Sequence, residues 1–495
     1  MFDESDVKPD RTLIGWPSSS IREAYEQDVS VVFLDEHGFW VRHQNEVVRR
    51  LVRPYVDQFT RRINKPLHSI RTELNWWNPM FTRMMGRAEE YELIRSHSIL
   101  TIFKLVSTMQ DLGIGRTVLF TGVAHHFDTM AICISCEVIG MPQIYFYPSV
   151  FEGELIPLVQ GRGIWDRQIP KVFLRTTDYS KILDSFLQNK QANFHPKQNQ
   201  TSTFWKLSYI CGLGIVTLRS LLEIYLELKL KLFSGRKNGE ISRAWVWKSP
   251  YRISGAMKIL NNQRRFLHQY RVVTLSTENL RILKTADHPR ILIAAHFQPE
   301  ATSFPEGGHY SNHVEIALAI RTLGYRDDIL YKEHFATSWY SSHIFGPSRV
   351  GIYRSESYIN ELTEMGCKFV ESGVNLSINP NECSWYLPVT IGGTLVIERS
   401  LAGLRTIICG EPWFRDIPGA MHISKIQSLE SIDNSWVTPD ESLAIQAKNF
   451  LIQMLENHTL TNYPGIGTGI RGEDSESGDF TTQFDRLIDH IKLEC

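Results

Sequence analysis

The second half of the chain alternates between short apolar runs and segments with helical spacing of apolar residues. Residues 290–297 form an apolar run rich in isoleucine, and residues 314–324 place apolar side chains at intervals of three and four. The same succession returns in residues 327–335, where a strand is expected, and in residues 357–370, where a helix and then a strand are expected. Strands that alternate with helices predict an α/β domain with a parallel sheet.

The first half contains a second series of the same kind. Residues 29–40 and 116–122 contain β-rich runs, residues 97–113 have a helical pattern, and residues 141–150 predict another strand. Helical patterns occupy most of the stretch between the two series and return near the C-terminal end. The predicted organisation is an N-terminal Rossmann-like domain, a helical connecting region, a C-terminal Rossmann-like domain and C-terminal helices, over residues 1–200, 201–284, 285–437 and 438–495.

Composition and charge narrow the class of protein. A chain of 495 residues is longer than one ordinary core supports, so at least two domains are expected. Its 42% hydrophobic and 22% charged residues are typical of a globular protein, and a formal net charge of −1 creates no field that attracts nucleic acid. The acidic, polar first residues do not resemble a secretory signal, and seven scattered cysteines suit a reducing compartment. We therefore expect a cytoplasmic protein that does not bind nucleic acid.

The most apolar region, residues 204–233, leaves two interpretations open. Charged residues interrupt it, so its uncharged run is shorter than the roughly 18 residues that a membrane span needs. A helix packed between domains is the plainer interpretation. Because the region then becomes basic, a helix on the inner face of an anionic membrane is the alternative, with the contact near residues 228–237.

The loop after the first strand of the second series is the strongest candidate for chemistry. Loops that join strand to helix in α/β domains commonly hold ligand-binding groups. In residues 295–308, His296 and Gln298 offer neutral donors for hydroxyl, carboxylate or phosphate groups, and Glu300 offers a carboxylate. Two prolines stiffen the loop, which lowers the entropy cost of binding. The alternative is that His296 and Glu300 only satisfy backbone groups of a buried loop.

A second candidate loop follows the next strand. Lys332 and His334 alternate along an extended chain end, so their side chains should point the same way. Such a cationic pair suits a phosphate or a carboxylate. The alternative is a surface ion pair between Lys332 and Glu333.

A third candidate loop contains a glycine pair. Gly392 and Gly393 let a ligand approach the backbone closely, and Thr394 can cap the helix that follows. The N-terminus of that helix favours an anion, and Glu398 lies one turn further on. The alternative is ordinary helix capping without a ligand.

The first half offers one candidate cluster and no clear metal site. His125, His126 and Asp128 follow a predicted strand; adjacent histidines point in different directions, and Asp128 is either a helix N-cap or a catalytic carboxylate. Cys133 and Cys136 form a lone C-x-x-C pair in an apolar run, which favours two buried side chains. The chain has no zinc-binding H-E-x-x-H, no Asp-x-Asp and no Walker phosphate loop. We expect no metal and no cofactor.

Taken together, the loops of the second half resemble the bacterial capsular polysaccharide biosynthesis proteins, a family that includes the Kdo transferases of capsule and O-antigen assembly. The likeness covers residues 265–420 and rests on the order and spacing of four motifs. These are HFQPEAT from residue 296, KEH from residue 332, GGT with a glutamate four residues after the threonine, and G-x-x-W from residue 410. The first motif is the most specific of the four.

The resemblance implies a B-fold glycosyltransferase, in which two Rossmann-like domains face each other across a cleft. It implies transfer of a ulosonic acid, with Kdo the leading candidate, from a CMP-linked donor to a glycan or glycolipid acceptor in surface polysaccharide biosynthesis. A monophosphate leaving group can be stabilised by cations and a helix N-terminus without a metal. Carried over to this sequence, the catalytic carboxylates would be Glu300 and Asp128, and the donor site would contain His296, Gln298, Lys332, Glu333, His334, Gly392, Gly393, Thr394 and Glu398.

The sequence also departs from the family pattern. Phe335 replaces the proline that usually follows KEH, and Arg399 replaces a small residue at the helix start. These differences leave another CMP-ulosonic acid open as donor. Two further alternatives are another B-fold transferase that uses a UDP-sugar or CDP-polyol donor, and a catalytically silent member that binds glycan.

Overall fold

A computed structural model describes the second half of the chain almost completely and the first half in part. In the first half it describes six strands and the helical positions 179–181, 183–184, 207, 209–215, 217–218 and 221. From residue 253 to residue 458 it describes all but residues 285–287, 299–305, 339–340, 343–345, 348–349, 373–375, 377–384 and 431. The chain divides into two compact units, one of residues 1–77, 95–186 and 449–495, the other of residues 78–94 and 187–448.

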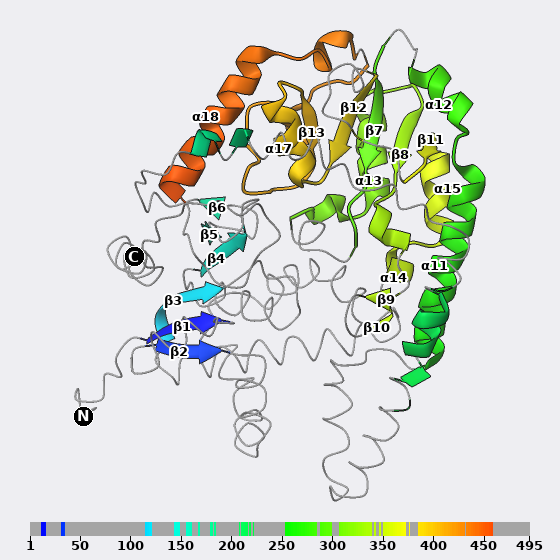
Figure 1. Cartoon of the computed structure of the whole chain (residues 1–495), viewed down its shortest axis with the longest axis horizontal. Coiled ribbons are helices and arrows are strands. Elements are labelled where there is room, and N and C mark those ends of the chain that lie inside the picture. Colours follow the sequence, from blue (N-terminus) through cyan, green and yellow to red (C-terminus); the bar gives the residue numbers. More distant parts are fainter. Residues whose placement is uncertain are drawn as a thin grey trace, which may run out of the picture. The chain divides into compact units, whose positions relative to one another are not determined.

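The second unit is built on a six-stranded parallel sheet (Figure 1). Its strands lie in the order β11-β8-β7-β12-β13-β14, and every neighbouring pair is parallel. Numbered by their sequence in the chain, this is the order 3-2-1-4-5-6 of a doubly wound Rossmann sheet. The strands are β7 (Arg290–Ala294), β8 (Ile329–Lys332), β11 (Cys367–Val370), β12 (Tyr386–Thr390), β13 (Thr406–Ile408) and β14 (Ala420–His422). The predicted α/β fold with a parallel sheet is confirmed for this unit.

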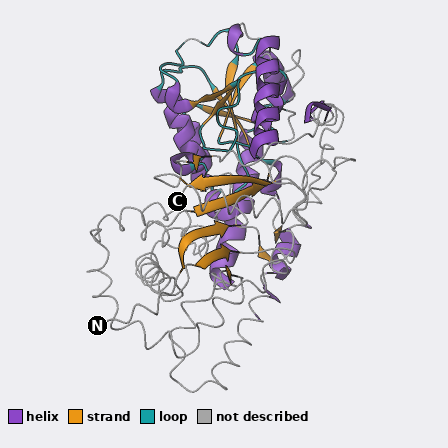
Figure 2. Ribbon diagram, turned by 90° about the vertical axis from the view of Figure 1, so that its left-hand side faces the viewer, coloured by secondary structure: helices purple, strands orange, loops and turns teal. Residues whose placement is uncertain are grey.

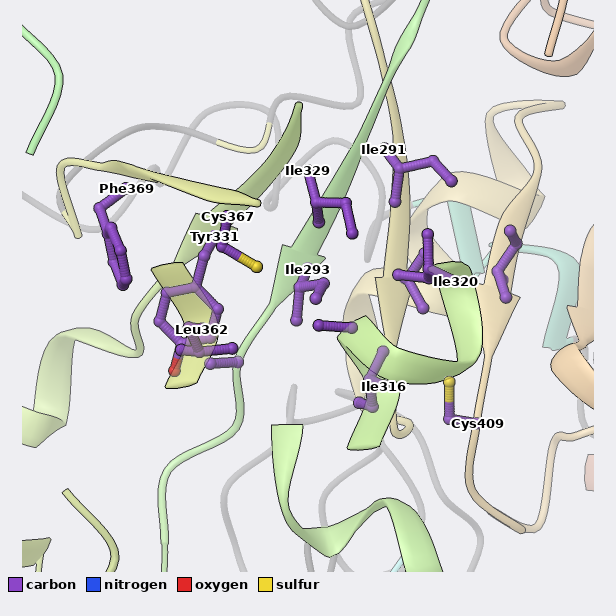
Figure 3. Packing of buried hydrophobic residues seen from close by; sticks show 14 of the residues in the cluster. Ile291, Ile293, Ile316, Ile320, Ile329, Tyr331, Leu362, Cys367, Phe369 and Cys409 are labelled. Carbon is purple, nitrogen blue, oxygen red and sulfur yellow. The ribbon is translucent and has the colours of Figure 1, made fainter. Parts of the chain in front are cut away.

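One face of the sheet packs against three helices: α11 (Ile253–Val273), α13 (His313–Thr322) and α15 (Glu356–Glu364). Apolar residues recur at helical spacing along α13, and its Ile316 and Ile320 join Ile291 and Ile293 of β7 in one core. Figure 3 shows these four isoleucines together with Tyr331, Leu362 and Phe369 of the same cluster.

The opposite face is also covered, which explains why β7 and β12 are apolar on both sides. Leu292, Ala294 and Leu330 point to this face and pack with partly buried residues of two helices, α12 (Thr277–Lys284) and α17 (Thr394–Leu401). Figure 2 shows the strands of this sheet with helices on both sides.

Helix α11 lies within the residues expected to connect the two domains, but it belongs to the core of the second unit. Its Leu260, Phe266, Leu267 and Tyr270 are buried in the same cluster as the strand residues. An apolar stripe at helical spacing needs a surface to cover, and the sheet face supplies one.

Short elements complete the second unit. They are an antiparallel pair, β9 (Ser341–Ser342) and β10 (Gly346–Pro347), and the one-turn helix α14 (Val350–Tyr353). Four 3₁₀ helices are η4 (Gly308–Ser311), η5 (Phe335–Ser338), η6 (Ile423–Lys425) and η7 (Asn434–Trp436). Helix α18 (Glu441–His458) begins in this unit, and its residues from 449 onward group with the first unit.

The first unit contains a mixed sheet in the order β2-β1-β3-β4-β5-β6. The pairs from β2 to β4 are parallel, and β5 and β6 are added antiparallel. Its strands are β1 (Arg11–Gly15), β2 (Val31–Leu34), β3 (Ile114–Phe120), β4 (Gln143–Pro148), β5 (Leu155–Gln160) and β6 (Arg167–Gln168). Strands β2, β3 and β4 match the predicted apolar runs. Within the described residues, no helix is long and apolar enough to cross a membrane.

Candidate functional site

The sequence motifs meet at the point where the winding of the parallel sheet reverses. The chain passes from β7 to its neighbour β8 on one side and from β12 to its neighbour β13 on the other. The loops after β7 and β12 therefore begin at a topological switch point at the carboxyl edge, where open α/β sheets bind ligands. His296 follows β7, and the Gly392–Gly393 pair follows β12.

Two contacts hold these loops together. His296 Nδ1 lies 3.3 Å from the Thr390 hydroxyl at the end of β12. A Cβ atom on Gly393 would lie 3.0 Å from His296 Nε2, so only glycine fits there without a shift of the imidazole. Gly393 also has a φ of +101°, which other residues rarely adopt. The structure thus brings the first and third motifs side by side.

The glycine, not the threonine, starts helix α17. Gly393 is the N-cap residue and makes no side-chain cap, while Thr394 is the first residue of the helix. The predicted capping role of Thr394 is therefore wrong. The reason is the positive φ of Gly393, which turns the chain into the helix one residue earlier. Thr394 is exposed at the helix start, and Glu398 is half-buried one turn later. Early N–H groups of a helix and its dipole favour an anion at this end.

Lys332 adds a cation at the same edge. It ends β8, and its register partner on β7 is the small Ala294. Its side chain therefore points to the face that carries Ala294 and helix α17. Burial lowers the pKa of Lys332 to about 8, and the neighbouring Glu333 charge opposes this shift only partly. None of the described residues forms a hydrogen bond or ion pair with its ammonium group.

Glu333 does not pair with Lys332. It forms a buried ion pair with Arg354, with 2.5 Å between Arg354 Nε and Glu333 Oε2 and both side chains 2% exposed. Tyr331 and Thr337 donate their hydroxyls to the same carboxylate at 2.9 and 3.0 Å. Burial alone would raise the pKa of Glu333, but the Arg354 charge together with the hydrogen bonds from Arg354, the His334 N–H and Tyr331 lowers it. The alternative interpretation, a surface ion pair between Lys332 and Glu333, is therefore wrong, because Glu333 is buried and pairs with Arg354.

Arg354 connects the first two motifs and was missed by the sequence analysis. Besides Glu333, it donates from Nη1 to Gln298 Oε1 at 2.7 Å and from Nη2 to the His296 carbonyl at 3.4 Å. Its guanidinium lies over the Tyr358 ring at 4.6 Å. Gln298 also donates its amide to the Ser311 carbonyl. Both ends of the Gln298 side chain are therefore engaged within the protein, which gives it and Glu333 a positioning role in the structure.

His313, at the start of α13, holds the backbone of His296 through a hydrogen bond. Its Nε2 accepts the backbone N–H of His296 at 3.1 Å, so its proton is on Nδ1, facing the Tyr358 hydroxyl at 3.2 Å. Burial and the Arg354 charge hold the pKa of His313 well below its ordinary value. This histidine had no recognisable motif, because its role depends on contacts with distant residues.

The histidines of the site are neutral near pH 7. Burial lowers the pKa of His296 to about 4, and burial and neighbouring charges lower that of His334 to about 4. The prediction of a cationic pair is therefore wrong for His334, which is neutral, while Lys332 keeps its charge near pH 7. His334 Nδ1 accepts the Ala336 N–H at 3.2 Å, which leaves Nε2–H as its donor. The described edge thus offers one ammonium, neutral imidazoles and a helix N-terminus, a set suited to an anion of low charge.

Glu300 and Asp128 both lie outside the described residues. Within the described part of the chain, no three His, Cys, Asp or Glu side chains gather as metal ligands. No model of a known protein family matches the chain, and no curated protein matches it.

Proposed function

We propose that the protein is a B-fold glycosyltransferase that moves a ulosonic acid from a CMP-linked donor to a glycan or glycolipid acceptor of a surface polysaccharide. The observation that carries the proposal is the meeting of the HFQ, KEH and GGT loops at the switch point of a sheet with Rossmann strand order. These are the loops on which the family resemblance rests, and this edge is where such sheets bind nucleotides.

The charge of the site fits this class of donor. The phosphodiester of a CMP-ulosonic acid carries one negative charge, and the sugar carboxylate carries another. Lys332 and the N-terminus of α17 match this low charge, and the neutral His334 can donate a hydrogen bond without adding charge. We assign Lys332 and Thr394 to the phosphate, His334 to the phosphate or the carboxylate, and the Gly392–Gly393 backbone to the nucleotide.

Catalysis in this proposal is mainly electrostatic. As the bond between sugar and phosphate breaks, negative charge grows on the CMP oxygen and positive charge on the sugar ring. The Lys332 ammonium and the N–H groups of α17 would stabilise the leaving phosphate, since they are fixed before the reaction. The resemblance assigns Glu300 and Asp128 to the anomeric centre or the acceptor hydroxyl, as nucleophile or base.

The test is thermal stabilisation by a panel of nucleotides: CMP, CDP, UDP, GDP and ADP, each with and without EDTA. A ligand at about 100 times its Kd stabilises the native state by about 2.7 kcal/mol. We expect CMP to raise the melting temperature with or without EDTA, and Lys332→Met to reduce the shift without removing it. Lys368→Met is the matched control, because Lys368 is an exposed lysine on β11 of the same sheet.

Other outcomes point to the alternatives. A shift with UDP or CDP in place of CMP would favour a UDP-sugar or CDP-polyol donor. A shift that needs a divalent metal would contradict the metal-independent mechanism. No shift with any nucleotide would leave the catalytically silent, glycan-binding role as the better account.

A further inference from the structure

A row of apolar side chains is exposed along the helical positions between residues 207 and 221. Seven large apolar side chains are exposed in the part of the chain that the structure describes, and four of them lie here. Leu207, Ile210, Leu218 and Leu221 are each between 60% and 70% exposed. The other three are scattered one to a helix, at Val272, Leu318 and Ile445. Single exposed apolar residues are ordinary, whereas a contiguous row marks an interaction surface.

The four side chains lie on one side of the helix. Their spacing of three, eight and three residues returns to the same face, and Gly214 lies on that face between Ile210 and Leu218. A side chain at Gly214 would meet no atom within 4 Å, so the space in front of this face is open. We call Leu207, Ile210, Leu218 and Leu221 the apolar stripe.

The other side of the helix is fixed to the second unit. The Tyr209 hydroxyl donates to Asn261 of α11 at 3.0 Å, and Arg264 of α11 lies over the Tyr209 ring at 5.6 Å. Leu213 packs against the core cluster of the sheet. The helix is therefore held by one face while the apolar stripe points away from the contacts that hold it.

Charge identifies the partner that fits this stripe. Residues 204–237 contain six cationic and two anionic side chains, although the whole chain carries a formal net charge of −1. The cations are Lys206, Arg219, Lys229, Lys231, Arg236 and Lys237, and the anions are Glu223 and Glu227. Apolar contact combined with an excess of positive charge matches the surface of an anionic bilayer, while a second copy of the same segment would bring like charges together.

We propose that the apolar stripe binds the surface of an anionic membrane, with the helix parallel to the bilayer plane. Leu207, Ile210, Leu218 and Leu221 enter the boundary between head groups and acyl chains, and the basic residues of the segment attract anionic lipid. The sequence alone suggested a membrane contact near residues 228–237, which lie outside the described part of the chain. The apolar stripe lies N-terminal to those residues. The attachment is independent of the proposed reaction.

Co-sedimentation of the full chain with vesicles tests the proposal. The vesicles are phosphatidylcholine alone, and equal parts of phosphatidylcholine and phosphatidylglycerol. We expect binding to the anionic vesicles, weaker binding to the neutral ones, and loss of the difference at high salt. The double variant Ile210→Asp/Leu218→Asp should bind anionic vesicles at least about tenfold more weakly. The variant Lys229→Glu/Lys231→Glu should also weaken binding to anionic vesicles, although it changes no residue of the apolar stripe.

The matched control is Leu318→Asp/Ile445→Asp, which changes two exposed apolar residues on other helices and should bind as the wild type does. Unchanged melting temperatures would show that all the variants fold. Failure of the wild type to bind either vesicle, or equal loss in the stripe and control variants, would overturn the proposal. So would a wild-type dimer, measured by light scattering, that becomes a monomer in Ile210→Asp/Leu218→Asp without any vesicle binding.

Discussion

Replacement of Arg354 by leucine should destabilise the second unit strongly. The change leaves the Glu333 carboxylate buried, 2% exposed, without its partner at 2.5 Å. Breaking a buried ion pair by removing one partner costs about 3–5 kcal/mol. Gln298 also loses the Nη1 donor at 2.7 Å, and a buried acceptor without a partner costs about 1–3 kcal/mol more. Arg354→Leu should therefore lose at least about 3 kcal/mol of stability.

The assay is thermal unfolding followed by near-ultraviolet circular dichroism. In a domain of this size each kcal/mol lowers the midpoint by about 2–4 °C, so the transition should move down by at least about 6 °C. Arg265→Leu is the matched control, because Arg265 is exposed on α11 and should change stability by less than about 0.5 kcal/mol. The double variant Arg354→Met/Glu333→Leu should recover part of the loss, since it removes both buried charges.

An unfolding midpoint of Arg354→Leu equal to that of the control Arg265→Leu would refute this prediction. That result would mean that Glu333 is hydrated or paired elsewhere. A double variant as unstable as the single one would show that lost packing, not the unpaired carboxylate, is the main cost. Either result would remove Arg354 as the link between the HFQ and KEH loops.

Three further predictions concern the residues at the carboxyl edge of the sheet. Gly393→Ala should lower the free energy of unfolding by about 1–2 kcal/mol and weaken CMP binding, because the residue has a φ of +101° and little room beside His296. The control Gly214→Ala, where the added Cβ would meet open space, should not lower the stability. CMP affinity, measured by calorimetry, should begin to fall as the pH rises above about 8, where Lys332 loses its proton, and this fall should be absent in Lys332→Met. Folding lowers the pKa of His296 and His334 to about 4, so the unfolded chain binds more protons than the folded chain below pH 6.5. The free energy of unfolding, measured by urea titration at each pH, should therefore fall as the pH falls from 6.5 toward 4. The fall should be less steep in His334→Gln.

The sequence predicts the elements of the second unit well because their signals are local. The run Ile291–Ala294 and the helical spacing of α13 identify a strand and a helix without knowledge of the fold. In the first unit, β1, β5 and the two-residue β6 were not predicted. Strand β5 contains a proline, a poor strand former, and its pairing with β4 is antiparallel, outside the parallel pattern.

The site is less predictable because its chemistry depends on distant partners. The partner of Glu333 is Arg354, 21 residues further on and in no motif. The charge of each histidine follows from burial, which no short sequence pattern reports.

The most direct test of the central claim is release of CMP from CMP-Kdo, measured by chromatography with the full chain and a preparation of bacterial surface glycan acceptors. The proposal predicts that CMP accumulates faster than in the protein-free control, with or without EDTA. Lys332→Met should lower the rate by about 100-fold, and Lys368→Met should leave it unchanged. CMP release at the protein-free rate, in a protein that CMP nevertheless stabilises, would contradict the transferase and leave a nucleotide-binding protein without this activity.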